Sequence, residues 1–326
     1  KQVTNYGTLL AAEKAYAGIL KKAAKELGDI YKTTGDYIEK LPGDELNAFG
    51  SEWYILGLAR SGRKVFDDYY KAIEKYVSEN IDENGRLDEK RATDNAKLVL
   101  VLSALDKDVT DVGGHDLLKA LSDMDYVTQQ GLSGAIYALL AFDCRGYDIP
   151  AADKNVEQTS REELVKYILG KQLKDGGWAY SGDKAEPDMT AMALQALAAY
   201  YKTDAKVKEA ADKAVTCLSK LQNTTGGYDS YGSVNSESAA QVITALTALG
   251  IDPDNDARFV KNGASVLDSL CGFYVDGGGF RHVSDGKLDP TATAQGYYAL
   301  AAYYRFAGSQ TALYDMTDLD TVEKAA

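Results

Sequence analysis

The 326-residue sequence contains no long apolar run and no cluster of basic residues, and both absences restrict its function. No stretch approaches the ~18 apolar residues of a membrane-spanning helix, so we expect no membrane insertion. Lysine and arginine are dispersed among aspartate and glutamate, and the formal net charge is −13. Such a chain is a poor partner for nucleic acid, whose phosphates require positive charge. We therefore expect a globular protein that binds no nucleic acid.

Cysteine and histidine are also scarce, with three cysteines and two histidines in the whole chain. His115 and His282 are far apart, and no cysteine pair has the spacing of zinc ligands, so we expect no metal and no cofactor. Cys144, Cys217 and Cys271 are expected to be buried thiols that pack as small hydrophobic residues. A disulfide between Cys217 and Cys271 is the alternative.

Only five prolines interrupt the chain, and no long span alternates as a β-strand would. The chain instead repeats two helix-type patterns joined by a glycine-rich loop, which indicates stacked helical hairpins. The loop aromatics of the three clearest copies are Trp178, Tyr228 and Phe280. Those copies read LGKQLKDGGWAYSG with DMTAMALQALAAYY, LSKLQNTTGGYDSYG with ESAAQVITALTALG, and LDSLCGFYVDGGGFRH with TATAQGYYALAAYY.

Weaker copies of the second helix lie upstream, so that six hairpins are expected in all. These copies cover residues 51–62, 94–108 and 131–143. The expected partner helices lie near residues 9–27, 65–79, 116–121, 161–173, 205–221 and 257–270. We predict an all-α fold, an α6/α6 toroid forming a single domain over residues 1–326, with strong repeats over 161–306 and weaker ones over 9–145.

The two helix sets differ in composition. Second helices, such as residues 190–200 and 242–249, are apolar or small on nearly all sides. First helices, such as residues 205–221, alternate charged residues with a single apolar face. This difference predicts an inner ring of buried helices inside an outer ring of amphipathic ones.

The loops of the form G-G-W/Y/F and the following A-L-x-A-L helices resemble the prenyltransferase and squalene-cyclase-like repeat, which is built as an α6/α6 barrel. The strings PDMTAMALQAL, SESAAQVITAL and TATAQGYYAL look most like uncharacterised surface or secreted proteins of Gram-positive bacteria, which pair such a toroid with a transcobalamin-like β domain. The resemblance implies a location outside the cell or at its surface. We expect a monomer whose partner is a small-molecule ligand or a neighbouring domain.

The motifs of the enzymes in this superfamily are incomplete here. Zinc-binding prenyltransferases and lanthionine cyclases need Cys and His at the barrel mouth, and thioester domains need C-G-E-Q; neither pattern is present. Squalene-hopene cyclases protonate an alkene with D-x-D-D-T-A. The matching string begins at Glu186 and keeps Asp188, but Met189 replaces the supporting carboxylate. Terpene-cyclase-like protonation by Glu186-x-Asp188 is therefore a minor alternative.

Aligning the inner helices on their A-L pairs gathers polar residues at one end of the ring. One column contains Asp188, Glu237 and Thr291; two residues earlier stand Glu186, Asn235 and Asp289; one turn deeper stand Met192, Gln241 and Gln295. One interpretation is that Asp188, Ser236 and Asp289 are helix N-caps. The other is that the carboxylates converge with the loop aromatics on a pocket at the mouth.

The leading functional hypothesis is a non-catalytic toroid that binds a small hydrophobic or amphipathic ligand, or a partner domain, at the N-terminal mouth of the inner helices. The candidate ligand-binding residues are Trp178, Tyr180, Asp188, Tyr228, Glu237, Gln241, Phe280 and Gln295. The loop aromatics have packing between hairpins as an alternative role. A glycan-active enzyme is the main alternative function, with an acid and a base drawn from Glu186, Asp188, Glu237 and Asp289.

Overall fold

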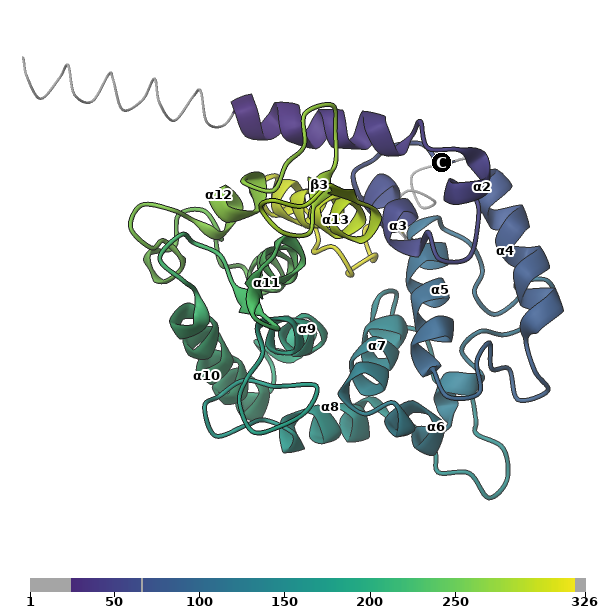
Figure 1. Cartoon of the computed structure of the whole chain (residues 1–326). Coiled ribbons are helices and arrows are strands. Elements are labelled where there is room, and N and C mark those ends of the chain that lie inside the picture. Colours follow the sequence, from purple (N-terminus) through teal and green to yellow (C-terminus); the bar gives the residue numbers. More distant parts are fainter. Residues whose placement is uncertain (1–24, 66, 320–326) are drawn as a thin grey trace, which may run out of the picture.

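The structure is a computed structural model that describes residues 25–65 and 67–319 of the chain, in which helices alternate between two rings (Figure 1). The inner helices are α3 (Glu52–Arg60), α5 (Ala92–Ala104), α7 (Leu132–Asp143), α9 (Pro187–Leu197), α11 (Ser236–Ala248) and α13 (Pro290–Ala307). The outer helices are residues 25–38, α4 (Asp67–Asn80), α6 (Met124–Gln129), α8 (Arg161–Gly170), α10 (Ala205–Leu221) and α12 (Val266–Cys271). Shorter helical elements are α2 (Gly43–Leu46), η1 (Ala120–Ser122), η2 (Ala198–Tyr200) and η3 (Ala257–Phe259).

The inner ring closes on itself. Each inner helix contacts the next one along the chain, and α13 packs against α3, which joins the last inner helix to the first (Figure 1). The described part of the chain is therefore an α6/α6 toroid, and the predicted fold class is confirmed.

Burial separates the two rings as the sequence patterns predicted. In the inner helix α5 every residue except Lys97 is buried. The outer helix α10 buries one face, on which Val207, Ala211, Val215 and Leu218 follow a helical spacing. Hydrophobic burial thus holds the inner ring on all sides and the outer ring on one side only.

Several helix limits differ from those expected. The first outer helix was predicted over 9–27, most of which lies outside the described residues, and the described helix there continues to residue 38. The partner helix predicted at 116–121 instead forms mainly as α6, because Asp123 accepts a hydrogen bond from the Tyr126 amide and caps the helix there. The range 257–270 divides into η3 and α12, since Ser265 and Asp268 form a capping box that starts α12.

The glycine-rich loops place their aromatic residues inside the fold. Trp178, Tyr228 and Phe280 are completely buried. The Trp178 amide donates to Thr190 Oγ1 at 2.9 Å, and its indole nitrogen donates to the Ile168 carbonyl of the preceding outer helix at 2.7 Å. A Cβ at Gly177 would lie 2.5 Å from Thr190 Oγ1, so only glycine allows this close approach. These aromatics wedge between adjacent hairpins.

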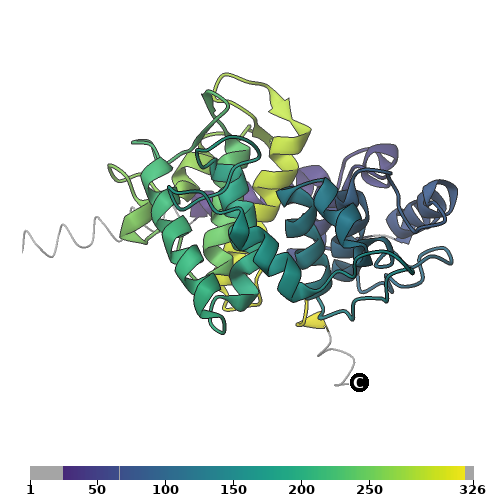
Figure 2. The same ribbon diagram turned by 90° about the horizontal axis from the view of Figure 1, so that it is seen from below.

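Two short β-hairpins lie at one end of the ring, and a C-terminal segment lies at the other end (Figure 2). Strands β1 (Asp229–Ser230) and β2 (Ser233–Val234) are antiparallel, as are β3 (Phe280–Arg281) and β4 (Leu288–Asp289). They precede α11 and α13, so they lie at the N-terminal mouth of the inner helices. Residues 310–319, here called the closing segment, follow α13 and lie at the C-terminal mouth.

The three cysteines are free thiols, so the alternative Cys217–Cys271 disulfide is wrong. Cys144 and Cys217 are buried, and Cys271 is partly buried. In the described ranges no helix combines the length and the apolar character that crossing a bilayer requires.

Candidate functional site

The residues of the predicted polar column lie at the cap positions and in the first turns of α9, α11 and α13. Asp289 caps α13, because its Oδ1 accepts the Ala292 amide at 2.8 Å, as predicted. The prediction that Asp188 and Ser236 are caps is wrong. Asn235 caps α11 through the Ser238 amide, and Glu186 stands at the cap position of α9 without a side-chain capping bond. Proline at the first position of α9 shifts Asp188 into the helix, so its carboxylate is free for other contacts.

Asp188 and Glu237 each bind the loop of the following hairpin. Asp188 Oδ2 accepts from Ser230 Oγ at 2.8 Å. Glu237 Oε2 accepts from Ser236 Oγ at 3.0 Å and lies 2.8 Å from His282 Nδ1. Ser230 and His282 both stand two residues after a loop aromatic, so the two contacts are the same repeat feature. Sequence reasoning missed both partners, although this spacing was a usable signal.

Asp188 differs from Glu237 in one respect. Its second oxygen, Oδ1, is buried and has no hydrogen-bond partner among the described residues. A buried carboxylate oxygen without a partner loses the solvation that it would have in water. Asp188 Oδ1 is therefore an unpaired acceptor that is enclosed beneath the mouth.

Three glutamines connect the inner helices below these carboxylates. Gln241 donates to Gln295 Oε1 at 3.0 Å and to the Tyr298 hydroxyl at 2.6 Å. Gln195 was not among the residues predicted from the sequence. Its Nε2 donates to the backbone carbonyl oxygen of Gln241 at 3.0 Å and to Gln241 Oε1 at 2.9 Å. The side-chain amides of these three glutamines are thus satisfied in part by one another.

Aromatic rings fill the lumen beside this network. Trp53, near the start of α3, is partly buried and lies 5.8 Å from the Tyr137 ring and 5.9 Å from the Tyr298 ring, between centroids. Burial, together with Tyr137 and the charges of Asp188 and Glu237, holds the pKa of Tyr298 well above its usual value. The negative charges of Asp188 and Glu237 at the mouth thus act on the Tyr298 phenol in the lumen.

Two tyrosines on the rim remain exposed. Tyr180 is 71% exposed and Tyr231 is 85% exposed. The Glu186 carboxylate, followed by burial, Asp188 and Tyr180, raises the pKa of the Tyr231 phenol, which places these groups near one another. Glu186 Oε2 also accepts the Tyr180 amide at 2.9 Å. Of the predicted ligand-binding aromatics, Tyr180 is therefore accessible, whereas Trp178, Tyr228 and Phe280 are enclosed.

Tyr231 has an unusual backbone conformation. It joins β1 to β2 with Gly232, and both residues have positive φ, 53° and 86°. Two positive values in a two-residue hairpin loop form a type I′ turn, in which asparagine or glycine is strongly preferred. A tyrosine there carries a steric cost, of order 1 kcal/mol or more. Its exposed ring gains no burial that would compensate.

The closing segment covers the opposite mouth. Arg60, at the end of α3, donates to the carbonyls of Leu313 and Asp315 at 2.9 and 2.8 Å. The Met316 amide donates to the Cys144 carbonyl after α7, at 2.8 Å, so the segment crosses the ring. Tyr314 is 8% exposed, and burial followed by Tyr298 and Tyr137 raises its pKa well above the usual value. Its ring therefore enters the lumen from this side.

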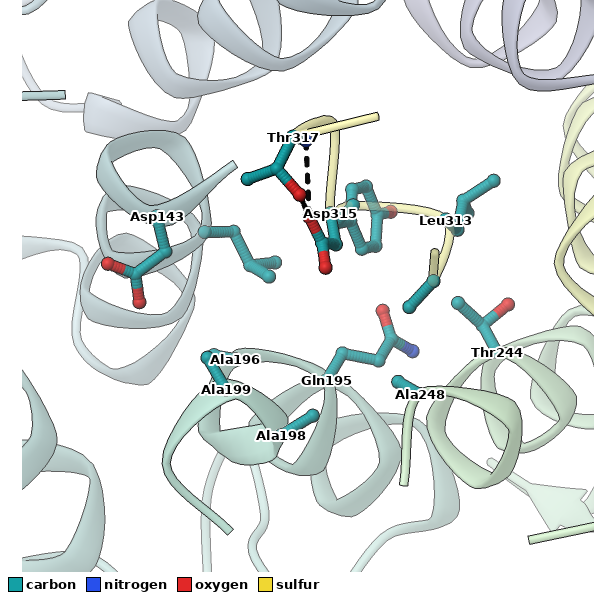
Figure 3. A pocket seen from close by; sticks show the side chains of 13 residues that line it. Asp143, Gln195, Ala196, Ala198, Ala199, Thr244, Ala248, Leu313, Asp315 and Thr317 are labelled. Atoms are coloured by element: carbon teal, nitrogen blue, oxygen red, sulfur yellow. Dashed lines mark hydrogen bonds between the residues drawn. The ribbon is translucent and has the colours of Figure 1, made fainter. Parts of the chain in front are cut away.

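A cavity of about 300 Å³ remains between the closing segment and the C-terminal ends of α7, α9 and α11 (Figure 3). Its position was not predicted, since the sequence patterns pointed to the other mouth. Among the described residues, no group of three or more His, Cys, Asp or Glu side chains is arranged to hold a metal ion.

The supporting carboxylate position of the terpene-cyclase motif faces away from the mouth. Met189 is buried at 6% exposure, and the next residue, Thr190, holds the Trp178 loop. Asp188 is thus the motif residue that points to the mouth, and a carboxylate in place of Met189 would lie in the core.

No protein-family model matches the chain, and no curated protein matches its sequence. Among solved structures, protein geranylgeranyltransferase-I of Candida albicans, complexed with GGPP, is similar with a TM-score of 0.56 and 12% identity, over 86% of this chain and 91% of that one. The ent-copalyl diphosphate synthase of Streptomyces platensis is similar with a TM-score of 0.51 and 15% identity, over 80% of this chain and 50% of that one. At these identities the similarity concerns the fold alone, and this chain shares the α/α toroid fold of those two proteins.

Proposed function

We propose that this protein is a binding toroid that takes a small amphipathic ligand, or the surface of a neighbouring domain, at the N-terminal mouth. The binding surface comprises Tyr180, Tyr231, Glu186 and Asp188, which we call the rim site. The protein acts outside the cell or at the cell surface of a Gram-positive bacterium, in line with the resemblance of its repeats. Glu237 has the position in α11 that Asp188 has in α9, and Gln295 belongs to the glutamine network below.

The observation that carries the proposal is Tyr231. An exposed aromatic ring in a turn position that disfavours tyrosine lowers stability and adds no packing. Backbone strain of this kind is common at ligand contacts, where binding compensates for it. Contact of the ring with a ligand explains why tyrosine occupies the position.

The chemistry of the rim site favours a neutral or cationic ligand. Two exposed tyrosine rings offer flat apolar faces beside the carboxylates of Glu186 and Asp188. The carboxylates of Glu186 and Asp188 repel anions, as does the net charge of −13. A ligand with an apolar face and hydroxyl or ammonium donors fits these groups.

Titration calorimetry with three octyl probes tests this selectivity: octyl β-glucoside, octyltrimethylammonium and octyl sulfate, each below its micelle concentration. The glucoside and the ammonium compound are expected to bind, and the sulfate is not. Equal binding of all three would contradict the charge argument. Absence of binding by every probe would contradict the amphipathic ligand class.

The variant Tyr231→Asn separates function from stability. It is expected to raise the free energy of unfolding by a few tenths of a kcal/mol or more, because asparagine suits the turn. It is also expected to weaken binding of the glucoside about fivefold or more, through the lost aromatic contact. The control is Leu221→Asn, which removes another exposed apolar side chain on α10. A Tyr231→Asn protein that is less stable and binds equally well would refute the proposal.

A glycan-active enzyme is the second candidate, and it is favoured by the same exposed tyrosines, which offer sugar-stacking surfaces beside carboxylates. In that case Asp188 and Glu237 supply the acid and base. Incubation with oligosaccharides, followed by measurement of released reducing ends, distinguishes it from binding alone. Turnover that is lost in Asp188→Asn would establish the enzyme; cyclised product from squalene would instead establish the terpene-cyclase alternative.

A further inference from the structure

The cavity of about 300 Å³ at the C-terminal mouth (Figure 3) is a second candidate site. It is lined by the C-terminal ends of α7, α9 and α11, whereas the rim site lies at their N-terminal ends. Its lining includes Asp143, Gln195 and Asp315, with alanines along the walls. We propose that this cavity binds a small aliphatic ammonium ion. The inference does not rest on the function proposed for the rim site.

The side chain of Gln195 gives the first reason. It is 6% exposed, and its amide nitrogen donates to two oxygens of Gln241, which uses both of its protons. The orientation of the amide is therefore fixed, and Oε1 must face the other way. It points into the cavity, and among the described residues it accepts no hydrogen bond (Figure 3). An acceptor that has no protein partner and faces a cavity takes its hydrogen bond from a ligand or from solvent.

The charge of the lining gives the second reason. Asp143 and Asp315 contribute carboxylates, and none of the cavity's lining residues is lysine, arginine or histidine. The ends of α7, α9 and α11 add the negative ends of three helix dipoles. Asp143 already accepts from Arg161 and from the Tyr200 hydroxyl, whereas the Asp315 carboxylate accepts from the amide and the hydroxyl of Thr317. A ligand with positive charge suits such a surface.

The apolar walls and the volume of the cavity favour an alkylammonium ion over a hydrated metal ion. Five alanines and two leucines surround the polar groups: Ala196, Ala198, Ala199, Ala248, Ala312, Leu140 and Leu313. The volume is that of about ten water molecules. A short alkyl chain fills such walls better than a hydrated metal ion does, so an alkylammonium with a stem of a few carbon atoms matches them.

Basic residues nearby are held by other partners or lie outside the cavity. Arg60 and Arg305 are buried and bind Asp318 at 3.0 and 2.7 Å. Lys202 lines an adjoining cavity of about 390 Å³, which also includes Asp315. The two cavities also have Ala198, Ala248 and Ala312 in common among their lining residues.

Titration calorimetry with butane-1,4-diammonium and with butane-1,4-diol tests the proposal on the whole chain. The two probes have nearly the same shape and differ in charge. The diammonium is expected to bind at least about tenfold more tightly, since a hydrogen bond to a charged group contributes that much. Equal affinities, or absence of binding by both up to millimolar concentrations, would overturn the proposal.

Two variants locate the binding. Asp315→Asn keeps an acceptor for Thr317 and removes the charge, and we expect about tenfold weaker binding of the diammonium. Ala248→Leu fills the cavity and is expected to abolish binding. Asp285→Asn is the matched control, because it removes one exposed negative charge at the other mouth. Melting curves verify that each variant is folded. The proposal is refuted if Asp315→Asn and Ala248→Leu both bind the diammonium as Asp285→Asn does.

Discussion

Replacing Tyr314 with alanine tests whether the closing segment is part of the core. Tyr314 is 8% exposed and enters the lumen near Tyr298 and Tyr137. Truncation of a buried aromatic residue costs about 3 to 5 kcal/mol, from lost burial and from the cavity left behind. We expect about 3 kcal/mol, near the lower limit, because the residue lies at the edge of the core and the segment can partly collapse.

The assay is urea unfolding followed by circular dichroism, supported by thermal melting. A loss of about 3 kcal/mol corresponds to roughly 5 °C for a chain of this length. Tyr314→Phe should cost less than about 1 kcal/mol, because it keeps the buried ring and removes only the hydroxyl. The size-matched control is Tyr180→Ala, at a residue that is 71% exposed. If Tyr314→Ala cost no more than Tyr180→Ala, the closing segment would not be packed in the lumen.

Three further outcomes are expected. Thr190→Val should lower the free energy of unfolding by about 1 to 3 kcal/mol, because the buried Trp178 amide loses its acceptor; an unchanged urea midpoint would contradict that hydrogen bond. Thiols should react with a chromogenic disulfide far more slowly in the folded protein at pH 8 than in urea, because burial raises the pKa values to about 12, about 11 and about 12 for Cys144, Cys217 and Cys271. The free energy of unfolding should fall as the pH rises from about 10 towards 12, because burial raises the pKa of both Tyr147 and Tyr303 to about 12. In the unfolded chain these phenols lose their protons at a lower pH than in the folded protein. A pH-independent urea midpoint over that range would refute this.

The helical class and the ring could be predicted from the sequence because both follow from periodic signals. Apolar residues on all sides of one helix set and on one face of the other determine which ring is buried. Six repeats of the same hairpin then require a closed or stacked arrangement, and the similar A-L segments gave the inner helices to within a few residues. The G-G-aromatic loops also predicted packing positions, since two glycines allow the close approach at Gly177.

The arrangement of the candidate sites depended on tertiary structure. Alignment of the repeats predicted that Asp188 and Glu237 lie at the same mouth. It could not tell which residue caps each helix, because the actual cap positions, Glu186 and Asn235, lie only two residues earlier, in the same helical turn. Their partners Ser230 and His282 come from the next hairpin, 42 and 45 residues away, and pairing them requires the packing of one hairpin on another. The closing segment carries no repeat signal, so only the closed ring revealed that Tyr314 enters the lumen. Local periodicity fixes which faces are buried, whereas contacts between distant residues depend on ring closure, and both proposed sites consist of such contacts.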